Sequence, residues 1–458
     1  MDKFVIYQLL PRLFGNTTKE PVHNGSLEEN GSGTFENIDS KVLAYFKKLS
    51  VSYIWLTGII KHSTGEESFV KGKAGSPYAI KDYYDLAPYL AKEPENRMEE
   101  FESLLQRAKE ADLKVLIDFV PNHLSRSYGE GFDDSNFYPG RICDGDWTDT
   151  VKLNYGHEGA WNYSTWVKMR DILLFWASKG VDGFRCDMVE LVPVQFWAWA
   201  LPTIKSQYPS CIFVAEIYNP SNYASYLASG FDYLYDKDDT YDTLRAVSRG
   251  ERSASSITYC WQHQGDFQHN MLKFLENHDE QRLASEFFLG DARRGFAALY
   301  VSLFLNTSPF MLYFGQEFGE KAAESEGFSG KDGRTSIFDF TVVPSVRRAL
   351  LGESLKDEQE LCSEYISLLS KATRIPAFSK GETYDLQYVN HYSSVYDPYW
   401  IFSFLRFYEG EFYLCVVNFS NEEREVEVNI PNNVFVTSPV KVKVGANNGT
   451  IVQLASNA

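Results

Sequence analysis

Short apolar runs alternate with helix-like segments along most of the 458-residue chain. In the first helix-like segment the hydrophobic positions recur every three or four residues, at Ile38, Val42, Tyr45, Phe46 and Leu49. The apolar runs are short enough to be buried strands, and eight of them can be distinguished. They lie at Phe4–Leu10, Val51–Leu56, Lys114–Val120, Gly183–Asp187, Ile212–Glu216, about Tyr233–Tyr235, Leu272–Glu276 and Phe310–Phe314.

This alternation is typical of βα units, and eight such units predict a closed (β/α)8 barrel, or TIM barrel. The stretch after the third strand, about 123–161, is rich in Gly, Asp, Asn and Tyr, and we interpret it as a short excursion beside a cleft. Beyond about residue 378 only strand-like runs remain, at 400–407, 411–419 and 425–430. We therefore expect a barrel domain over 1–378 and an antiparallel β-sandwich domain over 379–458.

Composition narrows the classes of partner. A net charge of −18 without a Lys/Arg stripe argues against nucleic acid, because binding its phosphates requires many positive contacts. No apolar run reaches the roughly eighteen residues that span a bilayer. The first residues show neither an apolar signal core nor a cleavage site, so we expect a soluble, cytoplasmic protein. The 6 cysteines are scattered without CxxC pairs, and we expect them to be free thiols.

Polar residues gather where four of the predicted strands end. These segments are Asp118–His123, Gly183–Asp187, Val214–Glu216 and Glu276–Asp279. In a parallel barrel the carboxyl ends of all strands meet at one mouth, where reactive groups lie. Because side chains alternate along a strand, Arg185 and Asp187 share the inward face and Cys186 faces outward.

Asp187 and Glu216 have neighbours that suit retaining cleavage of a glycosidic bond. That reaction needs a carboxylate nucleophile and a protonated carboxyl about 5 to 5.5 Å apart. The cation of Arg185 favours ionised Asp187, whereas the apolar strand before Glu216 desolvates that carboxyl and raises its pKa. Any one of these carboxylates alone would more readily be a helix cap or a solvated loop end. Their coincidence on successive strands favours an active site.

These segments, in their order along the chain, closely resemble the short motifs of glycoside hydrolase family 13, the α-amylase family. The resemblance covers the barrel from Tyr7 to about Phe340. It implies that Asp187 forms the glycosyl-enzyme, that Glu216 is the acid/base, and that Asp279 stabilises the transition state. It also implies substrate contacts by a further set of residues: Tyr78, His123, Arg185, His278, Asn154 and Arg282.

The resemblance gives two other residues supporting parts. Asp118 is expected to orient Arg185 rather than to take part in the chemistry. Asn122 matches a position that often binds a structural calcium ion, but such hard cations need six to eight oxygen ligands, and the sequence does not reveal that set. We expect the chemistry to need no cofactor and keep a structural calcium ion as an open alternative.

The residues just after Asp187 depart from the best-known α-amylase pattern. Met188-Val189-Glu190-Leu191 stand where many α-amylases carry a Lys-His pair, so that Glu190 replaces a cationic donor with an acceptor. We expect hydrolysis of α-1,4 bonds in starch-like glucans or maltooligosaccharides. The alternative is a transglycosylase, of glucanotransferase or branching type, with the same triad. A third hypothesis, an inactive glucan-binding barrel, is disfavoured because all three carboxylates are present.

Overall fold

The predicted barrel is present in the computed structural model, which describes residues 3–436 and 439–455. Its parallel strands close in the order β1-β14-β13-β12-β11-β10-β5-β2. Their bounds are β1 (Val5–Leu9), β2 (Val51–Leu56), β5 (Lys114–Phe119), β10 (Gly183–Cys186), β11 (Ile212–Ala215), β12 (Tyr233–Tyr235), β13 (Met271–Phe274) and β14 (Phe310–Tyr313). Each lies within one or two residues of a run expected from the sequence, so the predicted barrel is confirmed.

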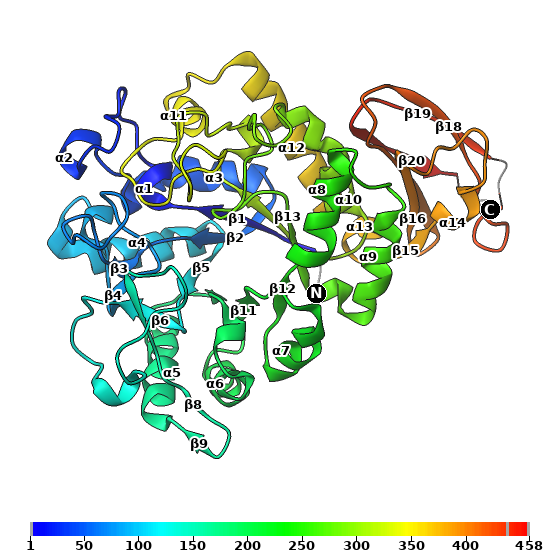
Figure 1. The fold of residues 1–458 in the computed structure, drawn as a ribbon. Coiled ribbons are helices and arrows are strands. Elements are labelled where there is room, and N and C mark those ends of the chain that lie inside the picture. Colours follow the sequence, from blue (N-terminus) through cyan, green and yellow to red (C-terminus); the bar gives the residue numbers. More distant parts are fainter. Residues whose placement is uncertain (1–2, 437–438, 456–458) are drawn as a thin grey trace.

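Helices surround the barrel and connect its strands (Figure 1). The longer ones are α3 (Ser40–Lys48), α4 (Arg97–Glu110), α5 (Tyr163–Ser178), α6 (Val194–Gln207), α7 (Tyr223–Ser229), α8 (Asp242–Ser248), α9 (Ser256–Gln264), α10 (Phe296–Phe304), α11 (Pro344–Leu351) and α12 (Lys356–Arg374). The shorter ones are α1 (Pro11–Phe14), α2 (Leu27–Asn30), α13 (Pro376–Ser379) and α14 (Gln387–Asn390). Within the described residues, none of these helices combines the length and apolar character needed to cross a bilayer.

Helix α3 illustrates how local sequence places these elements. The Asp39 carboxylate accepts hydrogen bonds from the backbone N–H groups of Lys41 and Val42, which have no partner inside the helix. Val42 and Phe46, four residues apart, lie on one face and are buried. Polar capping therefore begins the helix, and apolar spacing turns it toward the barrel.

Alternation along the strands separates two apolar cores. One fills the barrel and includes Ile6, Trp55, Leu116, Val214 and Met311. The other lies under the helices and includes Phe184 and Cys186 of β10. Because these two residues face the helices, Arg185 between them points into the barrel, and Asp187 follows on the same inward side.

Short hairpins extend from the mouth of the barrel. Their strands are β3 (Ile60–His62) with β4 (Ile80–Leu86), β6 (His123–Ser125) with β7 (Thr150–Lys152), and β8 (Gly156–His157) with β9 (Ala160–Trp161). The last two pairs make up the expected excursion after the third barrel strand. The first pair was not predicted, and the segment that joins its strands carries Tyr78.

A separate β domain lies at the C-terminal end of the chain, beside α9 and α10 (Figure 1). Its strands are β15 (Glu382–Asp385), β16 (Ile401–Tyr408), β17 (Glu411–Asn418) and β20 (Asn448–Leu454) in one antiparallel sheet, and β18 (Arg424–Val428) with β19 (Val440–Val444) in another. Leu405, Leu414, Val428 and Val444 belong to the apolar core of this domain. The fold class predicted for this part of the chain, an antiparallel β-sandwich, is confirmed.

Candidate active site

The register of two neighbouring strands places Asp187 beside Glu216. Parallel pairing aligns Cys186 of β10 with Ala215 of β11, and the Glu216 N–H continues the ladder by donating to the Cys186 carbonyl at 3.0 Å. Adjacent strands are about 4.8 Å apart. The two carboxyls, each directly after its strand, therefore lie side by side at the carboxyl end of the barrel. Both side chains are buried.

Arg185 is the cation at the centre of this cluster. Its Nη1 lies 2.8 Å from Asp187 Oδ1 and 3.3 Å from Asp118 Oδ1, and its Nη2 lies 2.9 Å from Glu216 Oε2. A planar guanidinium can serve several carboxylates because its donors point outward in a fixed fork. Trp55 Nε1 donates to the other oxygen of Asp118 at 3.1 Å. Asp118 thus holds Arg185 from below, while Arg185 holds the two neighbouring carboxyls.

The charge environment of Asp187 differs from the expectation. Its pKa is raised from the usual value because burial outweighs the opposing effect of Arg185. The sequence places Arg185 two positions before Asp187 and does not show its other partners. Since the same guanidinium also contacts Glu216, it does not by itself separate the two protonation states. Arg185 does favour the ionised form of Asp187, as predicted, but burial outweighs that effect on the pKa.

Glu216 is held at both carboxyl oxygens. Its Oε1 accepts from the Tyr218 hydroxyl at 2.6 Å, and its Oε2 accepts from the Met188 N–H at 2.7 Å. Met188 adopts a left-handed backbone with φ of 42°, an unusual conformation for a side-chain-bearing residue. Burial raises the pKa of Glu216 to about 7. A carboxyl that keeps its proton near neutral pH has the property of a general acid.

Asp279 completes the group of carboxylates from the far side of the mouth. Its side chain remains 32% exposed, and its Oδ2 lies 3.2 Å from His278 Nε2. The pKa of Asp279 is raised well above its usual value. Partial removal of the carboxyl from water is the largest cause, and the charge of Glu216 is the next. The structure thus brings the three expected triad carboxylates into one electrostatically coupled cluster around Arg185.

Tyr78 and His278 form a stacked pair next to this cluster. Their ring centroids are 5.4 Å apart, with an angle of 21° between the ring planes. The Tyr78 hydroxyl and His278 Nε2 are joined by a hydrogen bond. Gln8 Nε2 lies 2.8 Å from His278 Nδ1 on the opposite edge of the ring. Burial lowers the pKa of His278 well below its usual value. This imidazole is therefore neutral at neutral pH and can donate or accept a hydrogen bond without adding charge.

His123 lies at the start of the excursion and is also buried. Burial lowers its pKa to about 4. Its ring packs against Trp147 with centroids 5.2 Å apart, and Trp147 is 38% exposed. Trp147 was not singled out from the sequence, where its neighbours are polar and no periodicity marks it. The one feature of the sequence that could have pointed to Trp147 is an aromatic residue within a polar excursion.

Two of the expected substrate contacts, Arg282 and Asn154, have hydrogen-bond partners within the protein. Arg282 is fully buried, and its guanidinium donates to Glu276 Oε2 at 2.9 Å, to the Phe314 carbonyl at 2.9 Å and to the Thr335 hydroxyl at 2.8 Å. The buried carboxylate of Glu276 draws it away from the cleft, so the expected cleft contact is wrong. Asn154 uses its side-chain oxygen to accept from the Gly156 N–H at 2.9 Å, which closes a local turn.

The surroundings of Asn122 do not form a cage for a hard cation. Asn122 Nδ2 donates to Asp144 Oδ2 at 2.7 Å, and the Lys152 ammonium lies 2.8 Å from Asp144 Oδ1. Asn122 Oδ1 is buried without a hydrogen-bond partner, but one free oxygen is far from the six to eight that calcium takes. Over residues 3–436 and 439–455, no group of three His, Cys, Asp or Glu side chains could hold a metal ion. The described side chains around Asn122 therefore assemble no acidic ligand set, and a structural calcium ion stays a prediction.

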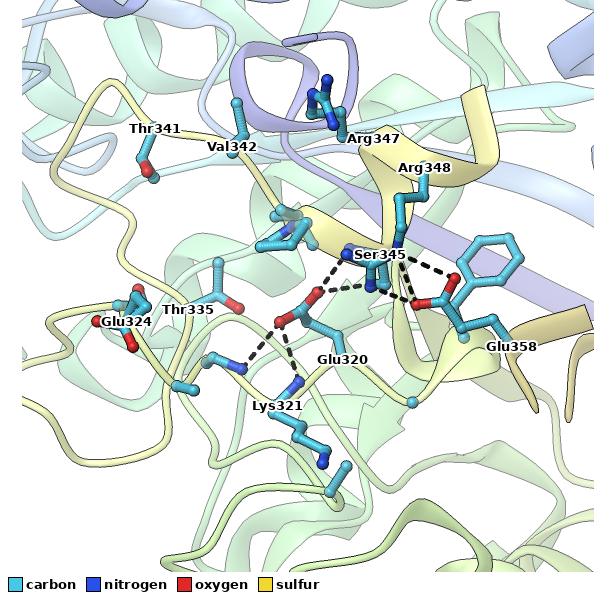
Figure 2. A pocket seen from close by; sticks show the side chains of 18 of the residues that line it. Glu320, Lys321, Glu324, Thr335, Thr341, Val342, Ser345, Arg347, Arg348 and Glu358 are labelled. Atoms are coloured by element: carbon cyan, nitrogen blue, oxygen red, sulfur yellow. Dashed lines mark hydrogen bonds and ion pairs between the residues drawn. The ribbon is translucent and has the colours of Figure 1, made fainter. Parts of the chain in front are cut away.

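A cavity of about 1510 Å³ is lined by residues other than the triad carboxylates, and Figure 2 shows part of its lining. It is lined by the segment that follows β14 and by parts of α11 and α12. Figure 2 shows Glu320 accepting hydrogen bonds from the backbone of Lys321 and from Ser345, and Arg348 paired with Glu358. These charged groups are occupied by their neighbours, and the triad carboxylates do not line this space. We therefore place the active site at the barrel mouth.

Comparison with known proteins agrees with this geometry. The model of the α-amylase catalytic domain matches residues 8–148 and 144–350 of the chain. The chain belongs to the α-amylase family, glycoside hydrolase family 13. It is accordingly an enzyme of that family, a glycosidase or a transglycosylase.

Relatives within the α-amylase family include both hydrolases and transferases by name. Alpha-amylase 3 of Dictyoglomus thermophilum is 25% identical over 430 residues, which span 82% of this chain and 78% of that protein. An alpha-1,4-glucan:maltose-1-phosphate maltosyltransferase of Cereibacter sphaeroides is 29% identical over 228 residues, or 46% of this chain and 36% of the transferase. A maltogenic alpha-amylase structure from Thermotoga neapolitana has the same fold, with a TM-score of 0.73, 24% identity and 98% coverage of both chains.

Proposed function

We propose that this enzyme is a retaining glycosidase that cleaves α-1,4-glucosidic bonds of starch-like glucans or maltooligosaccharides. The observation that carries the proposal is the strand register that sets Asp187 next to Glu216. Strand spacing of about 4.8 Å suits the separation of about 5 to 5.5 Å between carboxyls of retaining glycosidases. The names of the α-amylase relatives support the choice of substrate.

The chemistry follows from the positions of three carboxyls. Asp187 attacks the anomeric carbon while Glu216 gives its proton to the departing oxygen, so that the glycosidic bond breaks and a covalent glycosyl-enzyme forms. The Glu216 carboxylate then removes a proton from water, which attacks the same carbon and releases Asp187. Asp279 stabilises the positive charge that develops on the sugar ring. No step needs a cofactor, and cofactor-free chemistry stays a prediction, as does a cytoplasmic location.

The second candidate is transfer of the same intermediate to another sugar. It is favoured by the similarity to the maltosyltransferase and by Glu190, which stands where many α-amylases have a cationic donor. Hydrolysis and transfer share the first half-reaction and differ in which acceptor reaches the intermediate. The triad geometry is the same for both.

Product analysis with maltoheptaose tests the proposal. We expect shorter reducing sugars alone, with the first product released as the α-anomer in proton NMR. Longer or branched products would show that the enzyme transfers the sugar instead of hydrolysing the intermediate. A β-anomeric first product would exclude a retaining mechanism. Asp187→Asn and Glu216→Gln should each abolish turnover while circular dichroism remains unchanged. Glu110→Gln, at an exposed position in the last turn of α4, is the matched control and should keep full activity.

A further inference from the structure

Glu190 faces the chain segment that follows the acid/base. Its Oε2 accepts hydrogen bonds from the backbone N–H groups of Tyr218 at 2.9 Å and Asn219 at 3.2 Å. Its Oε1 accepts from Asn222 Nδ2 at 2.6 Å. Three donors of one strand-to-helix connection therefore converge on a single carboxylate. The carboxylate that interrupts the α-amylase pattern is engaged with the protein itself.

Tyr218 links this connection to the chemistry. Its backbone N–H is held by Glu190, while its hydroxyl donates to Glu216 Oε1 at 2.6 Å. The other oxygen of Glu216 is already bound by the Met188 N–H at 2.7 Å. A short chain of contacts thus runs from Glu190 through Tyr218 to the acid/base.

We infer that Tyr218 is a positioning residue for Glu216, and that Glu190 fixes Tyr218 in place by binding the backbone of residues 218 and 219. The inference rests on the proposed function, because it assigns partners to the acid/base of that reaction. When Glu216 has given up its proton, its carboxylate accepts the Tyr218 hydroxyl hydrogen bond. Glu190 acts on this step only through the chain segment that it holds.

The direction of the effect follows from the groups around Glu216. Those that face it from the other elements are Asp118 of β5, His123 of β6, Arg185 and Asp187 of the β10 end, Tyr235 of β12, and Asp279 beyond β13. Burial raises the pKa of Glu216, Arg185 and the Tyr218 hydrogen bond lower it, and Asp187 raises it further. A hydrogen bond to the charged form favours that form. Loss of the Tyr218 hydroxyl should therefore raise the pKa of Glu216.

The test is a titration of Glu216 in the full-length protein labelled with ¹³C at the glutamate carboxyls. Glu216→Gln identifies its NMR signal. In Tyr218→Phe we expect the midpoint to rise by about 0.5 pH units or more, and the alkaline limb of kcat/KM on maltoheptaose to move upward with it. The matched control is Tyr226→Phe, which removes a hydroxyl that donates to the Val189 carbonyl at 3.0 Å. It should shift neither profile.

Glu190 is tested in the same two assays. Glu190→Ala should raise the midpoint as Tyr218→Phe does. The double variant should shift it no further, because both changes remove the same contact, the hydrogen bond from the Tyr218 hydroxyl to Glu216. Glu190→Gln keeps an acceptor oxygen and should restore most of the wild-type midpoint. An unchanged midpoint in Tyr218→Phe, or additive shifts in the double variant, would overturn the inference.

The two assays also separate this inference from the proposed function. Wild-type protein that leaves maltoheptaose unchanged, while Tyr218→Phe still shifts the NMR titration, would remove the proposed function and leave the positioning contact standing. Normal cleavage of maltoheptaose by the wild-type protein, with an unshifted titration in Tyr218→Phe, would leave the proposed function standing and remove the positioning contact.

Discussion

Two buried arginines of the barrel, Arg185 and Arg282, differ in the number of carboxylates that surround them. Arg185 lies within 3.3 Å of Asp118, Asp187 and Glu216, so three carboxylates share one cation. Arg282 pairs with Glu276 alone and satisfies further donors with a carbonyl and a hydroxyl. Both guanidiniums also lie over aromatic rings, Arg185 over Trp55 and Arg282 over Tyr313.

This difference distinguishes a site for chemistry from a structural pair. A surplus of buried carboxylates holds protons at pH values where isolated carboxyls lose them, which is what a general acid requires. A one-to-one buried ion pair is adapted to stability, and it becomes costly only when one partner is removed. Arg185 should therefore matter for turnover, and Arg282 for folding.

The largest effect is expected at Arg185. In Arg185→Lys a single ammonium cannot bind Asp118, Asp187 and Glu216 at once, so kcat/KM on maltoheptaose should fall by about 10³-fold or more. Circular dichroism should show an intact fold. Steady-state kinetics provide the measurement, and a loss below tenfold would show that Arg185 does not organise the carboxylates.

Arg282 should show the complementary behaviour. Arg282→Met leaves the Glu276 carboxylate buried without its cation, which should cost about 3 to 5 kcal/mol of unfolding free energy. Adding Glu276→Gln removes that charge and should recover much of the loss. Urea unfolding measures both, with kcat per folded molecule near the wild-type value. A double variant as unstable as the single one would contradict the paired arrangement.

The surplus of carboxylates also predicts a pH-dependent stability. Because the pKa of Glu216 rises from 4.5 to about 7 on folding, the folded protein keeps a proton that the unfolded chain releases within this window. Wild-type stability should thus fall as pH rises through it. Glu216→Gln should raise Tm by about 2 °C or more at pH 8 and by less at pH 4. A difference in Tm that does not change with pH would argue against a buried, protonated Glu216.

The smallest effect concerns the partly exposed pair of Lys152 and Asp144. Such pairs contribute at most about 1 kcal/mol, so Lys152→Met should lower the free energy of unfolding by no more than this. Because the ammonium occupies the carboxylate beside Asn122, EDTA should leave Tm of the wild-type protein unchanged. A clear fall in Tm with chelator, reversed by calcium, would show a metal site that the contacts around Asn122 do not reveal.

Strand order and the inward carboxylates were accessible from the sequence because alternation and apolar runs are local patterns. Asp187 and Glu216 follow buried strands directly, so their direction could be derived. The inward turn of Arg282 could not, because it depends on Glu276 and on Thr335, which lies 53 positions further along the chain. The hairpin β3–β4 was missed because β3 has only 3 residues and the 60–86 segment is largely polar.

The contacts around Glu216 were hidden for a similar reason. Met188 reaches it through a left-handed backbone, and Glu190 reaches Tyr218 across two strand ends. Neither relation leaves a periodic signal in the sequence. The resemblance to the family supplied the triad roles, but it pointed to Glu190 only as a missing donor.

The central claim is that Asp187 becomes covalently bound to the sugar. A fluorinated maltosyl fluoride, whose glycosyl-enzyme hydrolyses slowly, should lose its anomeric fluoride and add one fluoromaltosyl mass to the intact protein. Peptide mass spectrometry should find this group on Asp187. Glu216→Gln should still be labelled, because fluoride departs without an acid, whereas Asp187→Asn should not. Labelling of another carboxylate, or turnover with no adduct and a β-anomeric product, would contradict the account.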